Sequence, residues 1–132
     1  MKYLLDTDIV IYFMKNLHGL AERIAIVEPS NLYISIITYS ELLFGAYNST
    51  HIEKNVAKVK LFTHDIQVLP FCEQSAEIYA EEKALLKKKG SILADLDLMI
   101  AGIALRHNYT LVTNNTKHFQ RIKNLKLVNW CK

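Results

Sequence analysis

The sequence predicts an α/β fold with a central parallel sheet. Short apolar runs rich in β-branched and aromatic residues alternate with longer helical patterns, which is typical of repeated βαβ units. The runs at residues 3–5 and 109–112 are apolar, as expected of strands covered on both faces. No repeat, low-complexity tract or Pro/Gly-rich linker divides the 132 residues. A single domain over residues 1–132 is therefore expected.

The first half of the chain contains two of the predicted strands. Gly19 separates two short helices, and Pro29 ends the second of them. The run after Pro29 is rich in Ile and Tyr, which favour strands. The expected elements are a strand at Tyr3–Leu5, helices at Ile9–Lys15 and Leu20–Val27, a strand at Leu32–Ile37, and helices at Tyr39–Tyr47 and Ile52–Phe62.

The second half continues the alternation. Three lysines followed by Gly90 form a normal helix C-terminal signature, and Asn108 ends a helix that is apolar nearly all round. The expected elements are a strand at Ile66–Leu69, helices at Ser75–Lys89 and Leu96–His107, a strand at Tyr109–Thr113, a short helix at Lys117–Ile122 and a last strand at Leu127–Trp130.

Composition favours a globular protein of a reducing compartment. The hydrophobic fraction is 51% and the charged fraction 22%, both near globular averages. Cys72 and Cys131 are far apart and form no Cys-x-x-Cys pair, so a cytoplasmic location fits better than a secreted disulfide scaffold. No apolar run near the start is long enough for a signal peptide or a membrane span, so no membrane association is expected.

Charge is distributed unevenly along the chain. Residues 1–97 carry ten Lys/Arg and all thirteen acids, whereas residues 98–132 carry six Lys/Arg and no acid. A one-sign segment suggests a polyanionic partner such as nucleic acid, although a solvated surface explains the charge equally well. The cations that could contact RNA are Lys117, Arg121, Lys123 and Lys126.

Asp6 directly follows the first predicted strand. In open α/β sheets the ligand crevice lies at the carboxyl ends of the strands. Asp6 can therefore serve metal coordination, but Asp6, Thr7 and Asp8 are also good residues for capping the next helix. We assign Asp6 to the site and Asp8 to the cap.

Glu41 follows the second predicted strand. The segment Thr38-Tyr39-Ser40-Glu41 matches a capping box, in which the Glu reaches back to the N-cap amide. The same position puts a carboxylate near the carboxyl end of a strand. Taken alone, this segment favours the cap.

Asp95 and Asp97 lie at the start of a predicted buried helix. Residues two apart on a helix do not share a face, so only one of the two can readily reach a common site. Asp95 is well placed as the N-cap, which puts Asp97 in the first turn, where the buried helix would hold it rigidly.

Three separated acids without a His or Cys pattern favour a hard cation. Mg²⁺ and Mn²⁺ prefer oxygen ligands, whereas structural zinc prefers thiolate and imidazole. In phosphodiester hydrolysis such an ion activates water and neutralises charge on the phosphate.

Four segments together resemble the PIN-domain toxins, and within them the VapC group of bacterial toxin–antitoxin pairs. The match covers the whole chain in order and spacing. The segments are Leu4-Leu5-Asp6-Thr7-Asp8-Ile9, then Ser35 to Gly45 with Glu41-Leu42, then Asp97-Leu98-Met99-Ile100-Ala101-Gly102, then Leu111-Val112-Thr113-Asn114-Asn115-Thr116-Lys117-His118-Phe119.

The resemblance implies a three-layer α/β/α PIN-like domain in which Asp6, Glu41 and Asp97 bind Mg²⁺ or Mn²⁺. It selects Asp97 over Asp95, because Asp97 precedes the matching Ile100-Ala101. The implied reaction is endonucleolytic cleavage of RNA, tRNA in several relatives, which arrests translation. The implied partners are a second copy of the chain and a VapB-type antitoxin, with operator DNA bound only through the antitoxin.

Two positions depart from the broader family pattern. Asn115 stands where many relatives carry a fourth acid; its side chain can accept a hydrogen bond from a water but brings no charge, so we include it among the candidate catalytic residues. Asp8 stands where relatives commonly have Asn, and an extra acid there could favour a cation or shift a neighbour's pKa. Thr113 either hydrogen-bonds an acid or positions a water, or it is an ordinary strand-end residue.

Two other functions fit parts of the sequence. Leu4 to Val10 also resembles the first motif of haloacid-dehalogenase-type phosphatases, in which Asp6 would attack phosphate. That assignment leaves Glu41 without a role. The chain could also be a catalytically weak RNA-binding PIN-like module, for which the Asn at position 115 is the best argument.

Overall fold

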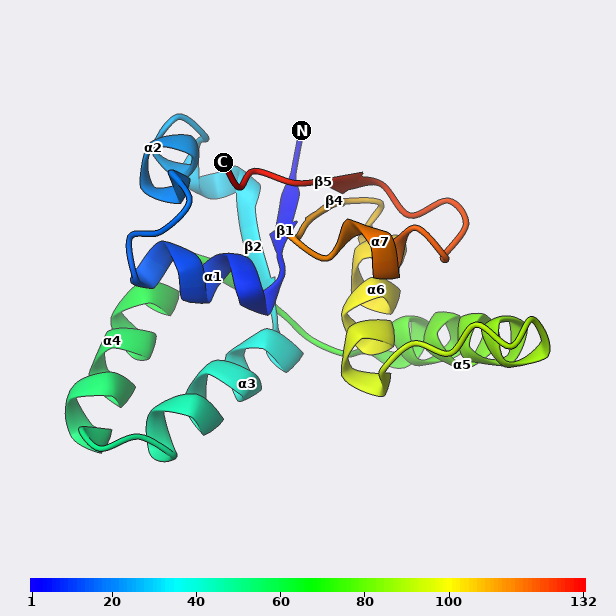
Figure 1. Cartoon of the computed structure of the whole chain (residues 1–132), viewed down its shortest axis with the longest axis horizontal. Coiled ribbons are helices and arrows are strands. Elements are labelled where there is room, and N and C mark those ends of the chain that lie inside the picture. Colours follow the sequence, from blue (N-terminus) through cyan, green and yellow to red (C-terminus); the bar gives the residue numbers. More distant parts are fainter.

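The computed structural model describes all 132 residues and contains one five-stranded parallel sheet in the order β3-β2-β1-β4-β5 (Figure 1). Each neighbouring pair is parallel, which confirms the predicted sheet. The strands are β1 (Tyr3–Leu5), β2 (Leu32–Ser35), β3 (Gln67–Leu69), β4 (Thr110–Val112) and β5 (Leu127–Val128).

Helices cover both faces of the sheet, which gives the three layers of a PIN-like α/β/α domain (Figure 1). The α-helices are α1 (Thr7–Met14), α2 (Leu20–Ala25), α3 (Ile36–Tyr47), α4 (Ile52–His64), α5 (Glu73–Lys88), α6 (Asp95–His107) and α7 (Thr116–Phe119), and a 3-10 turn spans Pro29–Asn31.

The core is divided in two by the sheet, as alternating side chains of a strand require. Leu4 packs in one cluster with residues of α5, α6 and α7, such as Ile100 and Phe119. Its neighbour Leu5 packs in the other cluster with residues of α1 to α4, such as Ile9 and Leu42. The short strands are therefore held mainly by burial on both faces.

The second strand is shorter than the sequence predicts. β2 ends at Ser35, and Ile36 and Ile37 begin α3. The Ser35 hydroxyl caps this helix by accepting a hydrogen bond from the Thr38 backbone N–H at 3.0 Å. The predicted capping box from Thr38 to Glu41 is therefore wrong, since both residues lie inside the helix.

Several other boundaries shift by one to three residues. Gly19 is the N-cap of α2 in the left-handed region (φ 68°), which confirms the break predicted there. The last strand stops at Val128 instead of Trp130. Trp130 instead packs edge-on against Tyr3, with the ring centres 4.8 Å apart.

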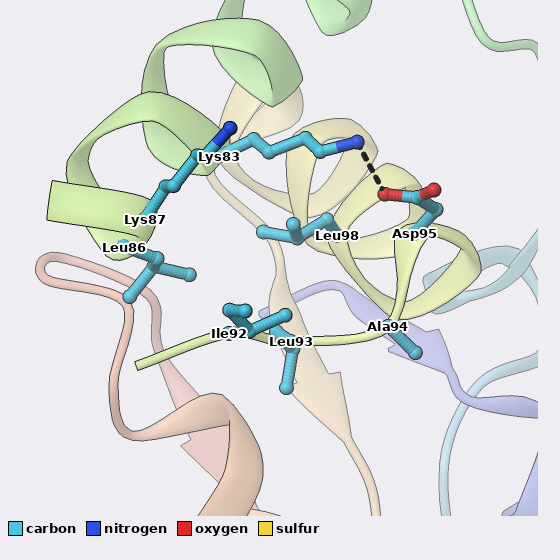
Figure 2. Close-up of a pocket in the computed structure, with 8 residues that line it drawn as sticks. All are labelled: Lys83, Leu86, Lys87, Ile92, Leu93, Ala94, Asp95 and Leu98. Atoms are coloured by element: carbon cyan, nitrogen blue, oxygen red, sulfur yellow. Dashed lines mark ion pairs between the residues drawn. The ribbon is translucent and has the colours of Figure 1, made fainter. Parts of the chain in front are cut away.

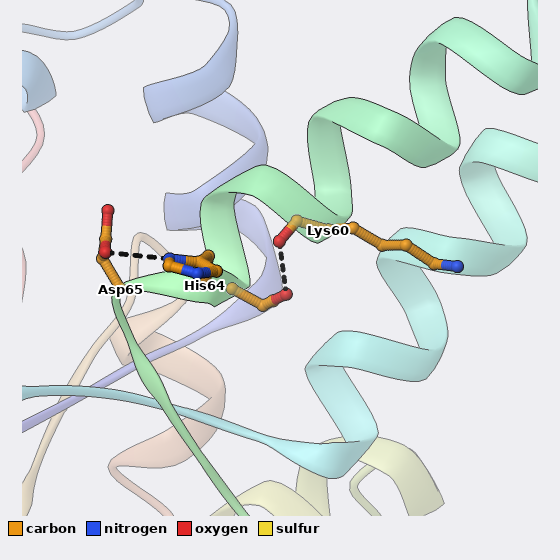
Figure 3. Close-up of polar contacts among 4 residues, drawn as sticks. Lys60, His64 and Asp65 are labelled. Atoms are coloured by element: carbon orange, nitrogen blue, oxygen red, sulfur yellow. Dashed lines mark hydrogen bonds and ion pairs between the residues drawn. The ribbon is translucent and has the colours of Figure 1, made fainter.

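Helix α4 ends at the surface, beside the edge strand β3. The Thr63 hydroxyl donates to the Lys60 carbonyl oxygen at 3.0 Å, and His64 Nδ1 lies 3.2 Å from Asp65 Oδ1 (Figure 3). Both contacts are exposed and so add little to stability. None of the helices is long and apolar enough to cross a membrane.

Candidate active site

Asp6 lies at the carboxyl end of the central strand β1 and caps the first helix. Its side chain is only 5% exposed. Oδ1 accepts from the Thr7 backbone N–H at 2.9 Å, and Oδ2 accepts from the Thr113 hydroxyl at 2.8 Å. Asp6 is therefore the N-cap of α1 and also a carboxylate at the carboxyl edge of the sheet.

Glu41 reaches the same edge from the second turn of α3. The Thr7 hydroxyl donates to Glu41 Oε1 at 2.7 Å and lies 3.0 Å from the Thr38 hydroxyl oxygen. Thr7 adjoins Asp6 in the chain, so its hydroxyl connects the start of α1 to α3. Because the capping box does not form, the Glu41 carboxylate is free to face this edge.

Asp97 lies in the first turn of α6 and is half-buried. Burial raises the pKa of Asp97, the nearby Glu41 and Asp8 carboxylates raise it further, and His118 acts in the opposite direction. Asp97 therefore lies within electrostatic reach of acids from α1 and α3.

Asp95 points away from the site. Its carboxylate pairs with Lys83 Nζ at 2.8 Å, at the rim of a cavity of about 380 Å³ between α5 and the start of α6 (Figure 2). Its Oδ1 also accepts from the Tyr79 hydroxyl at 3.2 Å. The N-cap of α6 is Ala94, so the prediction that Asp95 is the cap is wrong. The expectation that only one of these two acids reaches the site agrees with this arrangement.

Asp8 is not the helix cap that the sequence predicts, because Asp6 takes that position. Asp8 is the second residue of α1, and its Oδ2 accepts from the Asn114 backbone N–H at 3.1 Å. Its Oδ1 is buried and has no hydrogen-bond partner. Burial raises the pKa of Asp8, against several hydrogen bonds that lower it.

Thr113 and Asn115 follow β4 and border the acids. The Thr113 hydroxyl donates to Asp6 Oδ2, so of the roles left open for it the hydrogen bond to an acid is observed. It also accepts from the Asn115 backbone N–H at 3.0 Å. Asn115 is the N-cap residue of α7, but its side chain is exposed and makes no hydrogen bond to the acids. The structure thus brings its backbone to the site.

The pKa of Asp6 reflects its burial and the nearby carboxylates. Burial is the main cause that raises the pKa of Asp6 from 3.8 to about 7. The Asp8 carboxylate is the next cause and Asp97 a smaller one, while the hydrogen bonds from Thr113 and Thr7 oppose them. The donors present do not balance the negative charge, so a cation at this edge would be stabilised.

The donor set fits a hard divalent cation. No three His, Cys, Asp or Glu side chains are close enough to hold a metal ion by themselves. Mg²⁺ does not need such a cage, because it keeps several waters and binds through one or two carboxylates plus substrate phosphates. The oxygen-only donors and the partnerless Asp8 Oδ1 suit that mode of binding.

Sequence reasoning did not assign some residues that surround the acids. Thr7, Thr38 and Asn114 supply hydrogen bonds or close contacts at the site, and His118 lies near Asp97. The position of Thr7 between Asp6 and Asp8 was a usable signal. No local pattern could indicate the contacts of Thr38 and Asn114, because they depend on which strands are neighbours.

Known proteins resemble the chain over its full length. The PIN domain family model matches residues 3–125. "Ribonuclease VapC1" of Haemophilus influenzae is 41% identical over all of both chains, and "tRNA(fMet)-specific endonuclease VapC" of Salmonella typhimurium is 36% identical over 99% of each. Among solved structures, VapBC2 from Rickettsia felis, bound to a DNA fragment from its promoter, superimposes with a TM-score of 0.92 at 36% identity. The matched region spans 98% of this chain and 99% of the Rickettsia felis chain.

Proposed function

The chain belongs to the PIN-domain family and, within it, to the VapC ribonucleases, and from this premise we propose that it is a metal-dependent endoribonuclease, the toxin of a toxin–antitoxin pair. The observation that carries the proposal is the meeting of Asp6, Glu41 and Asp97 at one edge of the sheet. Asp6 is buried among like charges there, which is unfavourable unless a cation is bound.

We assign the cation, Mg²⁺ or Mn²⁺, to the carboxylates of Asp6, Glu41 and Asp97. When bound, it would supply Lewis acidity that activates water and offsets charge on the scissile phosphate. Thr113 and Thr7 orient the Asp6 and Glu41 carboxylates by hydrogen bonds of 2.8 and 2.7 Å. The buried helix α6 holds Asp97 in place, so the ligands are preorganised before substrate binds.

The fold and the family favour this function over the two alternatives. A phosphatase would use Asp6 as its nucleophile, but both Asp6 oxygens accept hydrogen bonds and Glu41 has a place in the site. A binding module without catalysis would not need three carboxylates crowded together. The exposed Asn115 side chain weakens the role that the sequence suggested for it.

The proposed substrate is tRNA, after the name of the Salmonella relative. Exposed Lys117 follows the site directly on α7, where it can contact a phosphate. The proposed location is the cytoplasm, where tRNA is found.

The proposed partners are a second copy of the chain and a VapB-type antitoxin. Solved relatives are VapBC complexes, and two of them are bound to DNA. We propose that the chain contacts operator DNA only through its antitoxin, because the acids at the sheet edge would repel a DNA phosphate in the absence of a cation.

The test is cleavage of a purified tRNA pool by protein freed of antitoxin, with Mg²⁺ or Mn²⁺. The variants are Asp97→Asn and the matched control Asp95→Asn, which removes an acid two residues away that faces Lys83. We expect discrete fragments from the unsubstituted protein and from Asp95→Asn. We expect none with EDTA, and a loss of at least ~100-fold in Asp97→Asn.

Cleavage that persists in EDTA would overturn metal dependence. Equal activity of the Asp97 and Asp95 variants would overturn the assignment of the site. Release of inorganic phosphate from phosphomonoesters, with Asp6 phosphorylated, would instead support the phosphatase alternative.

A further inference from the structure

Asp8 has a hydrogen-bonding arrangement that the cap role does not explain. One of its oxygens, Oδ2, accepts from the Asn114 N–H at 3.1 Å. The other, Oδ1, is fully buried and has no partner. A buried carboxylate oxygen without a donor or a cation costs free energy, so it is rarely retained without a use.

The Asn114 donor is itself fixed by the C-terminal segment. Asn129 Nδ2 donates to Asn114 Oδ1 at 3.0 Å, and Asn129 Oδ1 accepts from the Cys131 N–H at 2.9 Å. These bonds join the turn after β4 to the chain beyond β5. The Asp8 carboxylate is thus held by a short chain of hydrogen bonds that begins more than 120 residues later in the sequence.

The charged groups around Asp8 are acids. Asp6 and Asp97 both lie within electrostatic range of it, and Asp8 is joined to no Lys, Arg or His in an ion pair. The Cys131 thiol is also near: burial raises the pKa of that thiol and the Asp8 charge raises it further, but no hydrogen bond joins the two groups. Nothing cationic in the chain itself balances Asp8.

We propose that Asp8 is a further cation-binding carboxylate of the active site, with Oδ1 directed to the metal ion or its water shell and Asn129 acting as its positioning residue through Asn114. This inference rests on the proposed function, because it adds a ligand to the same cation. Asp8 thereby brings the number of carboxylates at the site to four, and Asn115 is not needed to supply charge.

A purely structural role for Asp8 predicts different effects of Asp8→Asn on stability and on cation affinity. An acid in the first turn of α1 interacts favourably with the helix dipole. If that were its only role, Asp8→Asn would lower the thermal stability of the metal-free protein and leave cation affinity unchanged. As a crowded ligand, Asp8 instead opposes Asp6, so the substitution is expected to stabilise the metal-free protein.

The test is isothermal titration of the antitoxin-free protein with Mn²⁺ alone, together with melting curves in EDTA. The variants are Asp8→Asn, which keeps the shape of the side chain, and Asp95→Asn as the matched loss of one acid. We expect Asp8→Asn to weaken Mn²⁺ binding at least ~10-fold and to raise Tm in EDTA. We expect Asp95→Asn to bind Mn²⁺ within about twofold of the unsubstituted protein, because its carboxylate faces Lys83.

A second variant keeps the proposal testable if Asp8→Asn does not fold. Asn129→Ala leaves the charge of Asp8 intact and removes only the anchor of Asn114, so we expect a loss of Mn²⁺ affinity of about two- to fivefold. Equal Mn²⁺ affinity in the unsubstituted protein and in Asp8→Asn or Asn129→Ala would overturn the proposal.

The two proposals fail in different ways. An unsubstituted protein that binds Mn²⁺ and cleaves tRNA, with an Asp8→Asn variant that binds Mn²⁺ equally well, removes Asp8 from the site and leaves the nuclease intact. An unsubstituted protein that binds no Mn²⁺ removes both.

Discussion

At the scale of single residues, Asp6 contributes strongly to how stability depends on pH. The pKa of Asp6 is about 7 in the folded protein, against the ordinary value of 3.8 expected in the unfolded chain. The folded protein therefore binds this proton more tightly than the unfolded chain does. Ionised Asp6 therefore destabilises the folded protein. This loss of stability is absent below about pH 4, grows as pH rises, and is complete above about pH 7. It amounts to something on the order of 4 kcal/mol, since one pKa unit corresponds to about 1.4 kcal/mol.

We therefore expect the free energy of unfolding in EDTA to fall between about pH 4.5 and pH 7. The Asp6→Asn variant, which has no proton to lose, is expected to show a flatter profile over the same range. Urea unfolding at several pH values measures both. A profile of the unsubstituted protein that is no steeper than that of the variant would contradict the assigned shift.

Thr113 gives the second prediction at this scale. Its hydroxyl donates to Asp6 and accepts from Asn115, so Thr113→Val leaves Asp6 Oδ2 without a donor. We expect a loss of Mn²⁺ affinity and of tRNA cleavage of roughly 10- to 100-fold. Thr110→Val at the start of β4 is the control, because Thr110 is also buried but makes no side-chain hydrogen bond to the acids. Equal losses in the two variants would indicate a general effect of replacing a buried Thr in or next to β4.

At the scale of elements, the packing of α5 on α6 depends on Gly102. A Cβ at this position would lie 2.9 Å from the Ser75 backbone oxygen, so Gly102→Ala would force the two helices apart. We expect a loss of about 1–3 kcal/mol in the free energy of unfolding. Because α6 carries Asp97, cation affinity is expected to fall as well.

Gly45 in α3 is the matched control, since a Cβ there meets nothing within 4 Å. Gly45→Ala is expected to stabilise the protein by up to about 1 kcal/mol, because Ala favours the helix and restricts the unfolded chain. Chemical unfolding of both variants tests the pair. A loss of stability in Gly45→Ala comparable to that in Gly102→Ala would contradict the account of the α5–α6 contact.

The sequence predicts the kinds of elements better than their ends. The alternation of strands and helices is correct because burial on both faces leaves a clear apolar pattern. The predicted end of β2 is wrong because Ile36 and Ile37 continue a β-branched run. The start of α3 is marked instead by the hydrogen bond from the Thr38 N–H to the Ser35 hydroxyl. The capping-box interpretation of Glu41 failed for the same reason.

At the scale of the whole molecule, the site depends on the strand order. Pairing of β1 with both β2 and β4 places Asp6 beside Thr113 and brings Thr7 to Glu41. The sequence placed Asp6 at a strand end correctly, but it could not give the order, because the strands are all short and apolar. The contact of Asn114 with Asp8, and that of Asn129 with Asn114, depend on that order too.

Two lysines of the basic segment, residues 98–132, lie at opposite ends of β4. Lys117 follows the carboxyl end of β4, where the acids lie. Lys126 donates from Nζ to the Asn108 carbonyl oxygen at 3.2 Å, at the opposite end of β4. The sequence treats the two lysines alike, whereas the fold places Lys117, and not Lys126, at the carboxyl end of β4.

Lys117→Ala is therefore expected to weaken tRNA binding and to reduce by about one the slope of log affinity against log salt. Lys126→Ala is expected to leave the slope unchanged. Binding titrations in Ca²⁺, at several salt concentrations, measure both. A slope reduced equally by the two substitutions would contradict the division of the basic segment.

The position of Mn²⁺ in crystals of the antitoxin-free protein, located by its anomalous scattering, would show whether the cation binds at the acids. We expect a peak at the carboxyl edge of the sheet, bonded directly to carboxylate oxygens of Asp6 and Asp97, with Glu41 as a ligand directly or through water. A fully occupied Mn²⁺ that lies elsewhere, or an empty edge in crystals of protein that still cleaves RNA, would contradict this expectation.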